Sequence, residues 1–199
     1  SYGGCWDSMP DDTSFARFWD AVASDIWTPT TVSAGNYDAN ESCTRYVGDP
    51  AIAYNTITVA NMDDDDSAGA TNPERGDDTI NPGSSWGPTP GGRKKPDLAA
   101  PGTDIWSANN SHESQGYWVE YSGTSMAAPH VAGAVLLLQE YGIPNPLAQK
   151  AILIGTAEDK GSTGWDKYQG WGYLDLGHAW FHKDDWFTDF LSPNPDYQL

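Results

Sequence analysis

The sequence predicts an α/β protein in which helices pack against a mainly parallel sheet. Apolar residues recur at helical spacing between positions 15 and 26, and two short runs rich in β-branched residues follow at 30–34 and 56–60. Residues 126–141 are apolar on nearly every side, which is typical of a helix buried in the middle of a protein. Helices and strands that alternate along a chain favour a parallel sheet.

The first predicted helix follows the sequence DDTS at residues 11–14, whose carboxylates and hydroxyls can cap the N–H groups of a first turn. Its apolar residues are spaced so that they fall on one side of a helix. We therefore expect a single buried stripe. The stripe consists of Phe15, Phe18, Trp19, Val22 and Ile26.

Little regular structure is expected between residues 61 and 101. The first part of this segment contains an acidic run, which we interpret as a solvated loop. The second part is dense in glycine and proline, the residues that most strongly interrupt helices and strands.

Two helices are expected in the C-terminal third of the chain. Gly142 ends the first, at 126–141, because glycine readily adopts the conformation found at helix C-termini. Asn145 and Pro146 combine a cap with a first helical residue and predict another helix through PLAQKAILIGTA. Residues 182–199 are interpreted as a tail that closes the domain or begins a linker. The length of 199 residues suffices for one core, so a single domain is expected.

The charge of the chain excludes some classes of partner. There are 28 acidic and 10 basic residues, which gives a formal net charge of −18. Such a surface repels the phosphates of nucleic acids and anionic lipids. The longest apolar run, VLLL, is far too short to span a bilayer. We therefore expect neither nucleic acid nor a membrane surface as a partner.

The two cysteines, Cys5 and Cys43, are too few to define a disulfide framework. An acidic chain with ten tryptophans suits an extracellular setting, in which the two cysteines would pair. Two unrelated buried thiols are the alternative. We expect a secreted protein with a Cys5–Cys43 disulfide.

Ser125 stands in the sequence YSGTSMAAPHVAG, at the start of the predicted central helix. The free N–H groups and the positive dipole end of a helix lie beside its first turn. An isolated serine here would be a plain N-cap. The small neighbours, however, leave space for another chain to approach the hydroxyl, and Pro129 is tolerated only in a first turn. An anion that forms at this hydroxyl would meet helix N–H groups.

The segment GTSMAAPHVAG resembles the serine-nucleophile signature of the subtilases, the subtilisin-like serine proteases. SYGG at 1–4 resembles the family's substrate-binding strand, VSAGN at 32–36 the strand that ends in the oxyanion-hole asparagine, and GDPA at 48–51 the floor of the specificity pocket. SSWGPTPGGRKKPDLAAPG resembles the segment that leads to the nucleophile. The resemblance implies a three-layer α/β fold, with helices on both faces of a mainly parallel sheet that is incomplete at its N-terminal side.

By this resemblance, Ser125 attacks a peptide carbonyl. The side-chain amide of Asn36 and the backbone N–H of Ser125 donate hydrogen bonds to the resulting oxyanion, with a gap of about one carbonyl group between the two side chains. Acyl transfer needs donors aimed where negative charge develops, which agrees with an asparagine that faces a helix N-terminus. A simple turn residue after glycine is the alternative for Asn36. The family also has a cis bond at the proline that matches Asp49–Pro50.

The resemblance implies that an extended substrate lies against residues 1–3 as an added β-strand. The P1 side chain would enter between 1–4 and 33–36, over Gly48, and a glycine floor leaves room for bulky side chains. Tyr37 or Asp49 could narrow or charge this pocket. The substrate-binding residues expected are Ser1, Tyr2, Gly3, Gly4, Ser33, Ala34, Gly35, Gly48 and Thr124.

The family's catalytic aspartate and histidine motifs are absent from the sequence. His130 follows Ser125 by five residues, which rotates it about 140° away on a helix, so we interpret it as a core histidine. His112, His178 and His182 lack the motif context, and none is expected to be the general base. Because the family orders its triad Asp, His, Ser, residues 1–199 are expected to be the C-terminal portion of one peptidase domain.

The sequence therefore predicts a secreted serine endopeptidase that acts on polypeptides. Its expected partner is an N-terminal fragment of the same protease that carries the aspartate and the histidine, with a propeptide or an inhibitor as further candidates. A non-catalytic peptide-binding pseudoprotease is the alternative. A carbohydrate platform built from the ten tryptophans is a weaker hypothesis, because scattered tryptophans are more typical of a core.

No cofactor is expected for the chemistry, but structural calcium is a modest expectation. MDDDDSAG at 62–69 offers oxygen ligands at Asp63–Asp66. It lacks the spacing of an EF-hand, and a charge run is usually a solvated face. The resemblance adds the main-chain carbonyls of residues 51–56 as a second candidate. The sequence leaves the metal ligands unassigned.

Overall fold

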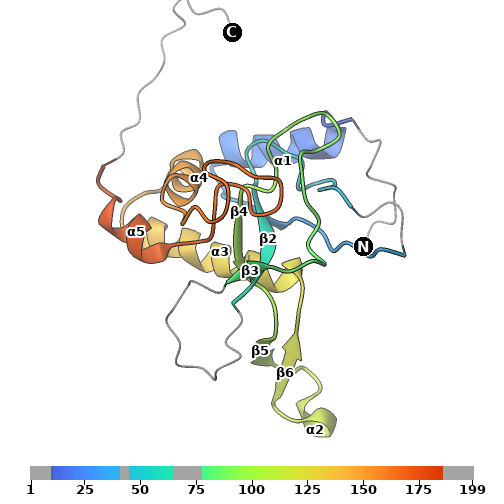
Figure 1. Ribbon diagram of the computed structural model, residues 1–199. Coiled ribbons are helices and arrows are strands. Elements are labelled where there is room, and N and C mark those ends of the chain that lie inside the picture. Colours follow the sequence, from blue (N-terminus) through green and yellow to red (C-terminus); the bar gives the residue numbers. More distant parts are fainter. Residues whose placement is uncertain (1–9, 41–44, 65–77, 186–199) are drawn as a thin grey trace, which may run out of the picture.

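The larger sheet is organised around the central strand β2 (Ile57–Asp63), which lies between the parallel strands β1 (Thr31–Ser33) and β4 (Leu98–Pro101) (Figure 1). The end of β2 also pairs antiparallel with the short strand β3 (Thr79–Ile80). The expected parallel α/β sheet is confirmed. The structure is a computed structural model that describes residues 10–40, 45–64 and 78–185.

Alternating residues of β2 point into two different parts of the core. Ile57 and Val59 belong to the apolar cluster that the C-terminal helices cover, whereas Ala60 and Met62 pack with Tyr173 in a cluster of their own. Ala16, from the first helix, packs in a third cluster with residues that follow β1 and precede β2. Because successive strand residues point to opposite faces, both faces of the sheet are covered.

The first helix, α1 (Ser14–Ser24), is capped by Thr13, whose hydroxyl accepts a hydrogen bond from the Ala16 N–H at 2.9 Å. Its position agrees with the sequence prediction, but the expected buried stripe is only partly buried. Val22 is buried, whereas Phe18 is 54% exposed. Phe15 and Ile26 are exposed as well, because no described segment packs over this side of α1.

The central helix, α3 (Thr124–Glu140), packs against β1, β2 and β4. Its buried residues are Thr124, Ala127, Val131, Ala134, Val135 and Leu138. The expectation of burial on every side is wrong within the described chain, where Leu136 is 65% and Leu137 is 44% exposed. The sheet covers only one face of α3. The helix ends as expected before Gly142, which has a φ of 86°.

The helix predicted after Asn145 is confirmed as α4 (Pro146–Gly155), and the Asn145 side chain accepts hydrogen bonds from the first N–H groups. A short helix that the sequence analysis missed, α5 (Leu176–Phe181), lies beside the C-terminal end of α3, where the rings of Tyr141 and Trp180 are 4.0 Å apart. Within the described part of the chain, no helix is long and apolar enough to cross a membrane.

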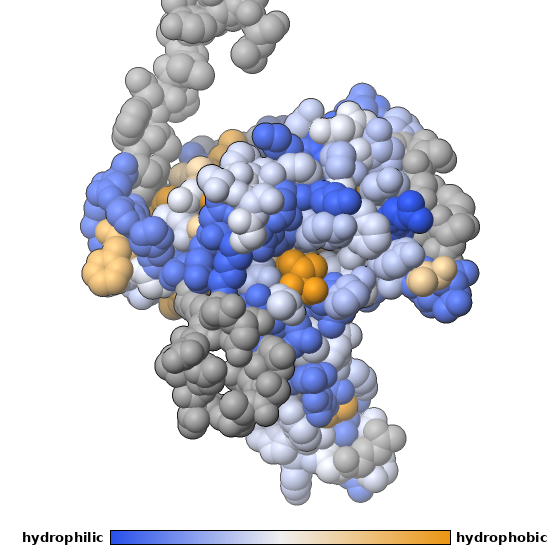
Figure 2. All heavy atoms as spheres, in the orientation of Figure 1, coloured by the Kyte–Doolittle hydropathy of each residue, from blue (hydrophilic) through white to orange (hydrophobic). Residues whose placement is uncertain are grey.

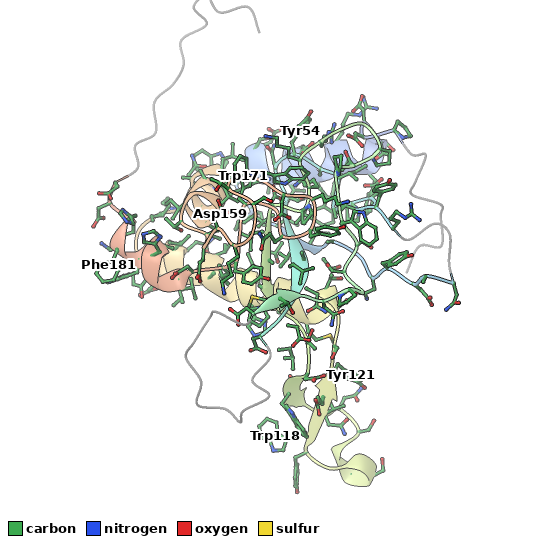
Figure 3. The ribbon with its side chains drawn as sticks, in the orientation of Figure 1. Tyr54, Trp118, Tyr121, Asp159, Trp171 and Phe181 are labelled. Carbon is green, nitrogen blue, oxygen red and sulfur yellow. The ribbon has the colours of Figure 1, made fainter. Side chains whose placement is uncertain are left out.

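A hairpin of β5 (Ile105–Ala108) and β6 (Trp118–Tyr121) projects from the body of the molecule, with the short helix α2 (His112–Gln115) at its tip (Figure 1). Figure 3 labels Trp118 and Tyr121 on this hairpin. β6 leads directly into α3, so the hairpin lies next to the first turn of that helix. The face of the molecule shown in Figure 2 is largely hydrophilic, which agrees with the net charge of −18.

A buried group of charges joins the sheet to α4. Asp97 accepts from Lys95 at 2.7 Å and from Lys150 of α4 at 2.9 Å, and it also accepts from the Thr58 N–H of β2 at 2.7 Å. Burial acts to raise the pKa of Asp97, but the two ammonium groups and their hydrogen bonds outweigh it and hold that pKa below its ordinary value. The carboxylate is therefore ionised, and it is paired twice.

Candidate active site

Ser125 lies in the first turn of α3, two residues after the N-cap Gly123, and its side chain is exposed. The helix N-terminus leaves backbone N–H groups without intrahelical acceptors. Met126 and Ala127 donate to the Gly123 carbonyl at 2.9 and 3.4 Å. Among the described residues, the Ser125 N–H has no acceptor, so it can donate to a group that approaches from solvent.

Asn36 follows β1 and reaches the same helix turn. Its side-chain oxygen Oδ1 accepts two hydrogen bonds from Thr124, one from the backbone N–H at 3.0 Å and one from Oγ1 at 3.0 Å. Because the backbone N–H can only donate, the oxygen rather than the nitrogen of the carboxamide faces Thr124. The Nδ2 amide group is consequently left to donate elsewhere. Asn36 therefore contacts the first turn of α3 at Thr124, and the gap expected between Asn36 and the Ser125 hydroxyl stays a prediction.

The backbone around Asn36 is held on both sides. Ser85 N–H donates to the Gly35 carbonyl at 2.9 Å, and Tyr37 N–H donates to the Gly83 carbonyl at 2.7 Å. Gly35 also donates its N–H to Thr124 Oγ1 at 3.3 Å. These bonds connect the end of β1, the loop after β3 and α3, so the position of Asn36 depends on all three segments.

Gly123 occupies a position that only glycine fits well. Its φ of 148° lies in a region that other residues rarely adopt. A Cβ atom at this position would stand 3.4 Å from both Oδ1 and Nδ2 of Asn36, which is ordinary van der Waals contact. Gly123 N–H donates to the Gly102 carbonyl at 2.7 Å, which ties the start of the helix to the end of β4. The backbone conformation, rather than a lack of space beside Asn36, therefore requires glycine at the start of α3.

The other residues predicted to bind substrate are only partly described. Ser33 is the last residue of β1, and Ala34 continues the chain toward Asn36. The Ala34 N–H donates to the Val59 carbonyl at 2.9 Å. Gly48 is half-buried, in the segment that follows Val47. The structure brings Gly35, Asn36 and Thr124 together through hydrogen bonds. The predicted substrate-binding residues that lie outside the described ranges are Ser1, Tyr2, Gly3 and Gly4.

The cis bond expected at Asp49–Pro50 is present. Asp49 accepts a hydrogen bond from Thr13 Oγ1 at 2.6 Å, so one of its oxygens is directed toward the start of α1. The Tyr37 ring packs edge-on against Trp86 at 5.0 Å between centroids. One Asp49 oxygen and the Tyr37 ring are therefore in contact with other residues of the chain, and their effect on the pocket stays a prediction.

None of the four histidines lies beside Ser125 in the described structure. His130 is exposed, and its Nδ1 is 2.9 Å from the Met126 carbonyl, so its interpretation as a core histidine is wrong. It lies on a side of α3 that the sheet does not cover. His112 belongs to α2 at the tip of the hairpin, and His178 and His182 lie at α5, by the opposite end of α3 (Figure 1).

Two of the main-chain carbonyls in the calcium candidate at residues 51–56 accept hydrogen bonds from lysines. The Thr56 carbonyl accepts from Lys95 Nζ at 2.9 Å and from Lys150 Nζ at 2.8 Å, and the Tyr54 carbonyl accepts from Lys150 Nζ at 2.6 Å. The acidic run extends beyond Asp64 into residues outside the described ranges. The described residues hold no group of three or more His, Cys, Asp or Glu that could bind a metal ion.

A cavity of about 430 Å³, which the sequence does not predict, lies next to the Asn36 loop. Its wall includes Ser84, which pairs with Asn36, and the aromatic residues Trp86, Tyr168 and Tyr173. Lys160 and Asp78, which form an ion pair at 2.9 Å, also line this cavity. Ser125 is not among the residues that line the cavity, so it is separate from the candidate active site.

The fold and the first turn of α3 define a subtilisin-like serine peptidase. The family model of the subtilases, Peptidase S8, matches residues 11–172, and the chain belongs to this family.

Individual relatives agree with this assignment. The chain is 35% identical over 133 residues to the serine protease AprX of Bacillus subtilis, a match that covers 61% of this chain and 28% of AprX. The solved structure of fervidolysin from Fervidobacterium pennivorans, described as a keratinolytic enzyme related to subtilisin, aligns with a TM-score of 0.63 at 27% identity. That alignment covers 84% of this chain and 24% of fervidolysin. The CspB protease of Clostridium perfringens aligns with a TM-score of 0.56 at 28% identity, over 69% of this chain and 28% of CspB.

The matched regions span less than a third of these three relatives.

Proposed function

We propose that this chain carries the nucleophile and the oxyanion hole of a secreted serine endopeptidase. Ser125 Oγ would attack the carbonyl carbon of a peptide bond, and the amine would leave once the C–N bond breaks. The negative charge that develops on the carbonyl oxygen would meet the Ser125 N–H and Asn36 Nδ2. The observation that carries the proposal is the double hydrogen bond from Thr124 to Asn36 Oδ1, because it commits the oxygen and frees the nitrogen.

The reaction also needs a base to accept the Ser125 proton and to return it to the leaving amine. The remote positions of the histidines support a base that comes from another segment. We assign that role to an N-terminal fragment of the same protease, which would carry the aspartate and the histidine in the family's order. It would pack against Ser1–Gly4. A propeptide or an inhibitor would occupy the same cleft.

The substrate of this proposal is an extended polypeptide. It would lie against Ser1–Gly3 as an added β-strand and would form main-chain hydrogen bonds that tolerate many sequences. Its P1 side chain would enter over Gly48. We also propose that the protein is secreted, that Cys5 and Cys43 form a disulfide, and that Asp63–Asp66 bind a calcium ion. The acidic composition supports secretion.

A pseudoprotease that binds peptides without cleaving them is the second candidate. The histidine positions favour it, because Ser125 has no base among the described residues. The two candidates differ in one respect that can be measured. A protease is labelled at Ser125 and cleaves peptides, whereas a pseudoprotease binds peptides without either reaction at Ser125.

Labelling with a fluorophosphonate probe tests the proposal on the complete protease. We expect covalent labelling and peptide hydrolysis, and both should disappear in Ser125→Ala. Ser107→Ala is the matched control, because Ser107 is an exposed serine on β5 and its loss should leave labelling and hydrolysis unchanged. Unlabelled protein that binds peptides equally well with and without the Ser125 hydroxyl would favour the pseudoprotease.

A further inference from the structure

Two histidines lie next to each other at the C-terminal end of α5. His178 is in the last turn of the helix and His182 is its C-cap, so they are four positions apart. Residues with this spacing lie on the same side of a helix. The centroids of the two rings are 4.7 Å apart, with an angle of 81° between the planes, and both side chains are exposed.

The hydrogen bonds of the two rings fix their tautomers. His178 Nδ1 is 3.3 Å from the Thr156 carbonyl, and His182 Nδ1 is 2.6 Å from Asp185 Oδ2. A carbonyl oxygen and an ionised carboxylate can only accept, so each Nδ1 carries the hydrogen. In the neutral imidazole the lone pair is then on Nε2. Both rings therefore present an Nε2 lone pair while Nδ1 is held by an oxygen.

This arrangement is the one that metal-binding histidines adopt. The ring nitrogen that does not bind the metal usually donates to a carboxylate or a backbone carbonyl, which orients the ring. Asp185 and the Thr156 carbonyl supply one acceptor of each kind. A zinc ion binds imidazole nitrogens at about 2.0–2.1 Å, so two Nε2 atoms on rings this close together can share one ion.

The pair is remote from Ser125. α5 contacts the C-terminal end of α3 through the rings of Trp180 and Tyr141, whereas Ser125 is in the first turn. A helix of 17 residues is about 25 Å long, which separates the two places. Figure 3 labels Phe181 of α5 at the edge of the molecule, away from the hairpin. A ligand at the histidine pair would therefore not touch the reacting atoms.

We infer that His178 and His182 form a two-histidine site for a divalent transition-metal ion, with Cu²⁺ or Zn²⁺ as the class of ion that imidazole ligands select. Nε2 of each ring binds the ion, and water completes its coordination. Nitrogen ligands exclude calcium, which prefers oxygen. Because the ion bridges the last turn of α5 and its C-cap, binding holds this end of the helix together. The inference is independent of the proposed proteolysis.

Titration calorimetry on the full chain, without a histidine tag, tests the site with CuCl2 and ZnCl2. We expect one ion per chain. His178→Ala and His182→Ala should each weaken binding by at least about tenfold. His130→Ala is the matched control, because His130 is also exposed and also has Nδ1 beside a helix carbonyl, but it has no second histidine within reach on α3.

Two further measurements separate a metal site from a structural role of the histidines. Asp185→Asn keeps both ligands and should weaken binding by about tenfold, because it changes only the group that orients His182. Circular dichroism should show the same helix content in every variant. Equal affinity of the wild type, His178→Ala and His182→Ala would overturn the inference, as would an equal loss in His130→Ala.

Discussion

Thr124 donates two hydrogen bonds to Asn36 Oδ1, one from its backbone N–H and one from its hydroxyl, each at 3.0 Å. Thr124 is 1% exposed, so its hydroxyl is directed into the protein and not toward a substrate. The residue next to Ser125 therefore serves to hold Asn36. This role differs from the substrate-binding role that the sequence predicts for Thr124.

The first prediction concerns the Thr124 hydroxyl. Thr124→Val keeps the shape and the backbone donor but removes both Oγ1 bonds, the one donated to Asn36 and the weaker one accepted from the Gly35 N–H. A net hydrogen bond is worth about 0.5–1.5 kcal/mol, so we expect kcat to fall by about threefold to tenfold with little change in KM. Steady-state kinetics on the complete protease measure both constants. Thr124→Ser should retain full activity, and a valine variant as active as the serine variant would contradict the anchoring role.

The second prediction separates the two ends of the Asn36 carboxamide. Asn36→Asp keeps an oxygen for Thr124 but replaces the Nδ2 donor with a negatively charged oxygen. We expect kcat to fall by at least about 10²–10³, the loss taken from subtilisin, which is itself a member of this family. The melting temperature should stay close to that of the wild type. A variant that loses stability while it keeps kcat would show that Asn36 is only a structural turn residue.

Much of this site could be predicted because its residues are adjacent in local sequence patterns. The helix that begins near Ser125, the strand before Asn36 and the cap at Asn145 each follow from residue spacing or from a capping pair. The family resemblance then predicted that Asn36 meets the first turn of α3. The hydroxyl bond from Thr124 could not be predicted, because it depends on a contact between residues 88 positions apart.

The missed elements depend on partners that are distant in sequence. β4 has the sequence LAAP, whose alanines carry little strand preference, and it becomes a strand because Leu98 lies beside Val59 of β2. The strands β5 and β6 are joined by residues 109–117, so no short turn signal marks the hairpin. α5 has six residues, too few to show a helical period.

A third prediction concerns the buried carboxylate between two lysines. Asp97→Asn removes the charge that pairs with Lys95 and Lys150 and leaves both ammonium groups without it. Removal of one partner from a buried ion pair costs about 3–5 kcal/mol. Urea denaturation should show a loss of this size. Asp12→Asn is the control, because the exposed Asp12–Arg17 pair should contribute at most about 1 kcal/mol. Equal losses in both variants would contradict the prediction.

The last prediction is a rise of stability with pH that Lys95 causes. Burial lowers the pKa of Lys95 to about 7, and the attraction of Asp97 only partly offsets this effect. In the unfolded chain a lysine titrates near pH ~10.4. Between these two values the unfolded chain binds more protons than the folded chain, so the free energy of unfolding increases with pH by at most about 1.4 kcal/mol per pH unit.

Urea denaturation at several pH values between about 7 and 10 measures this slope. Lys95→Met removes the titrating group, so its free energy of unfolding should change less with pH than that of the wild type, while Lys150 still pairs with Asp97. Lys94→Met is the control, because Lys94 is an exposed neighbour and its loss should leave the slope unchanged. If the wild type and Lys95→Met have the same slope, the Lys95 ammonium group titrates alike in the folded and unfolded chains, and its burial does not set its pKa.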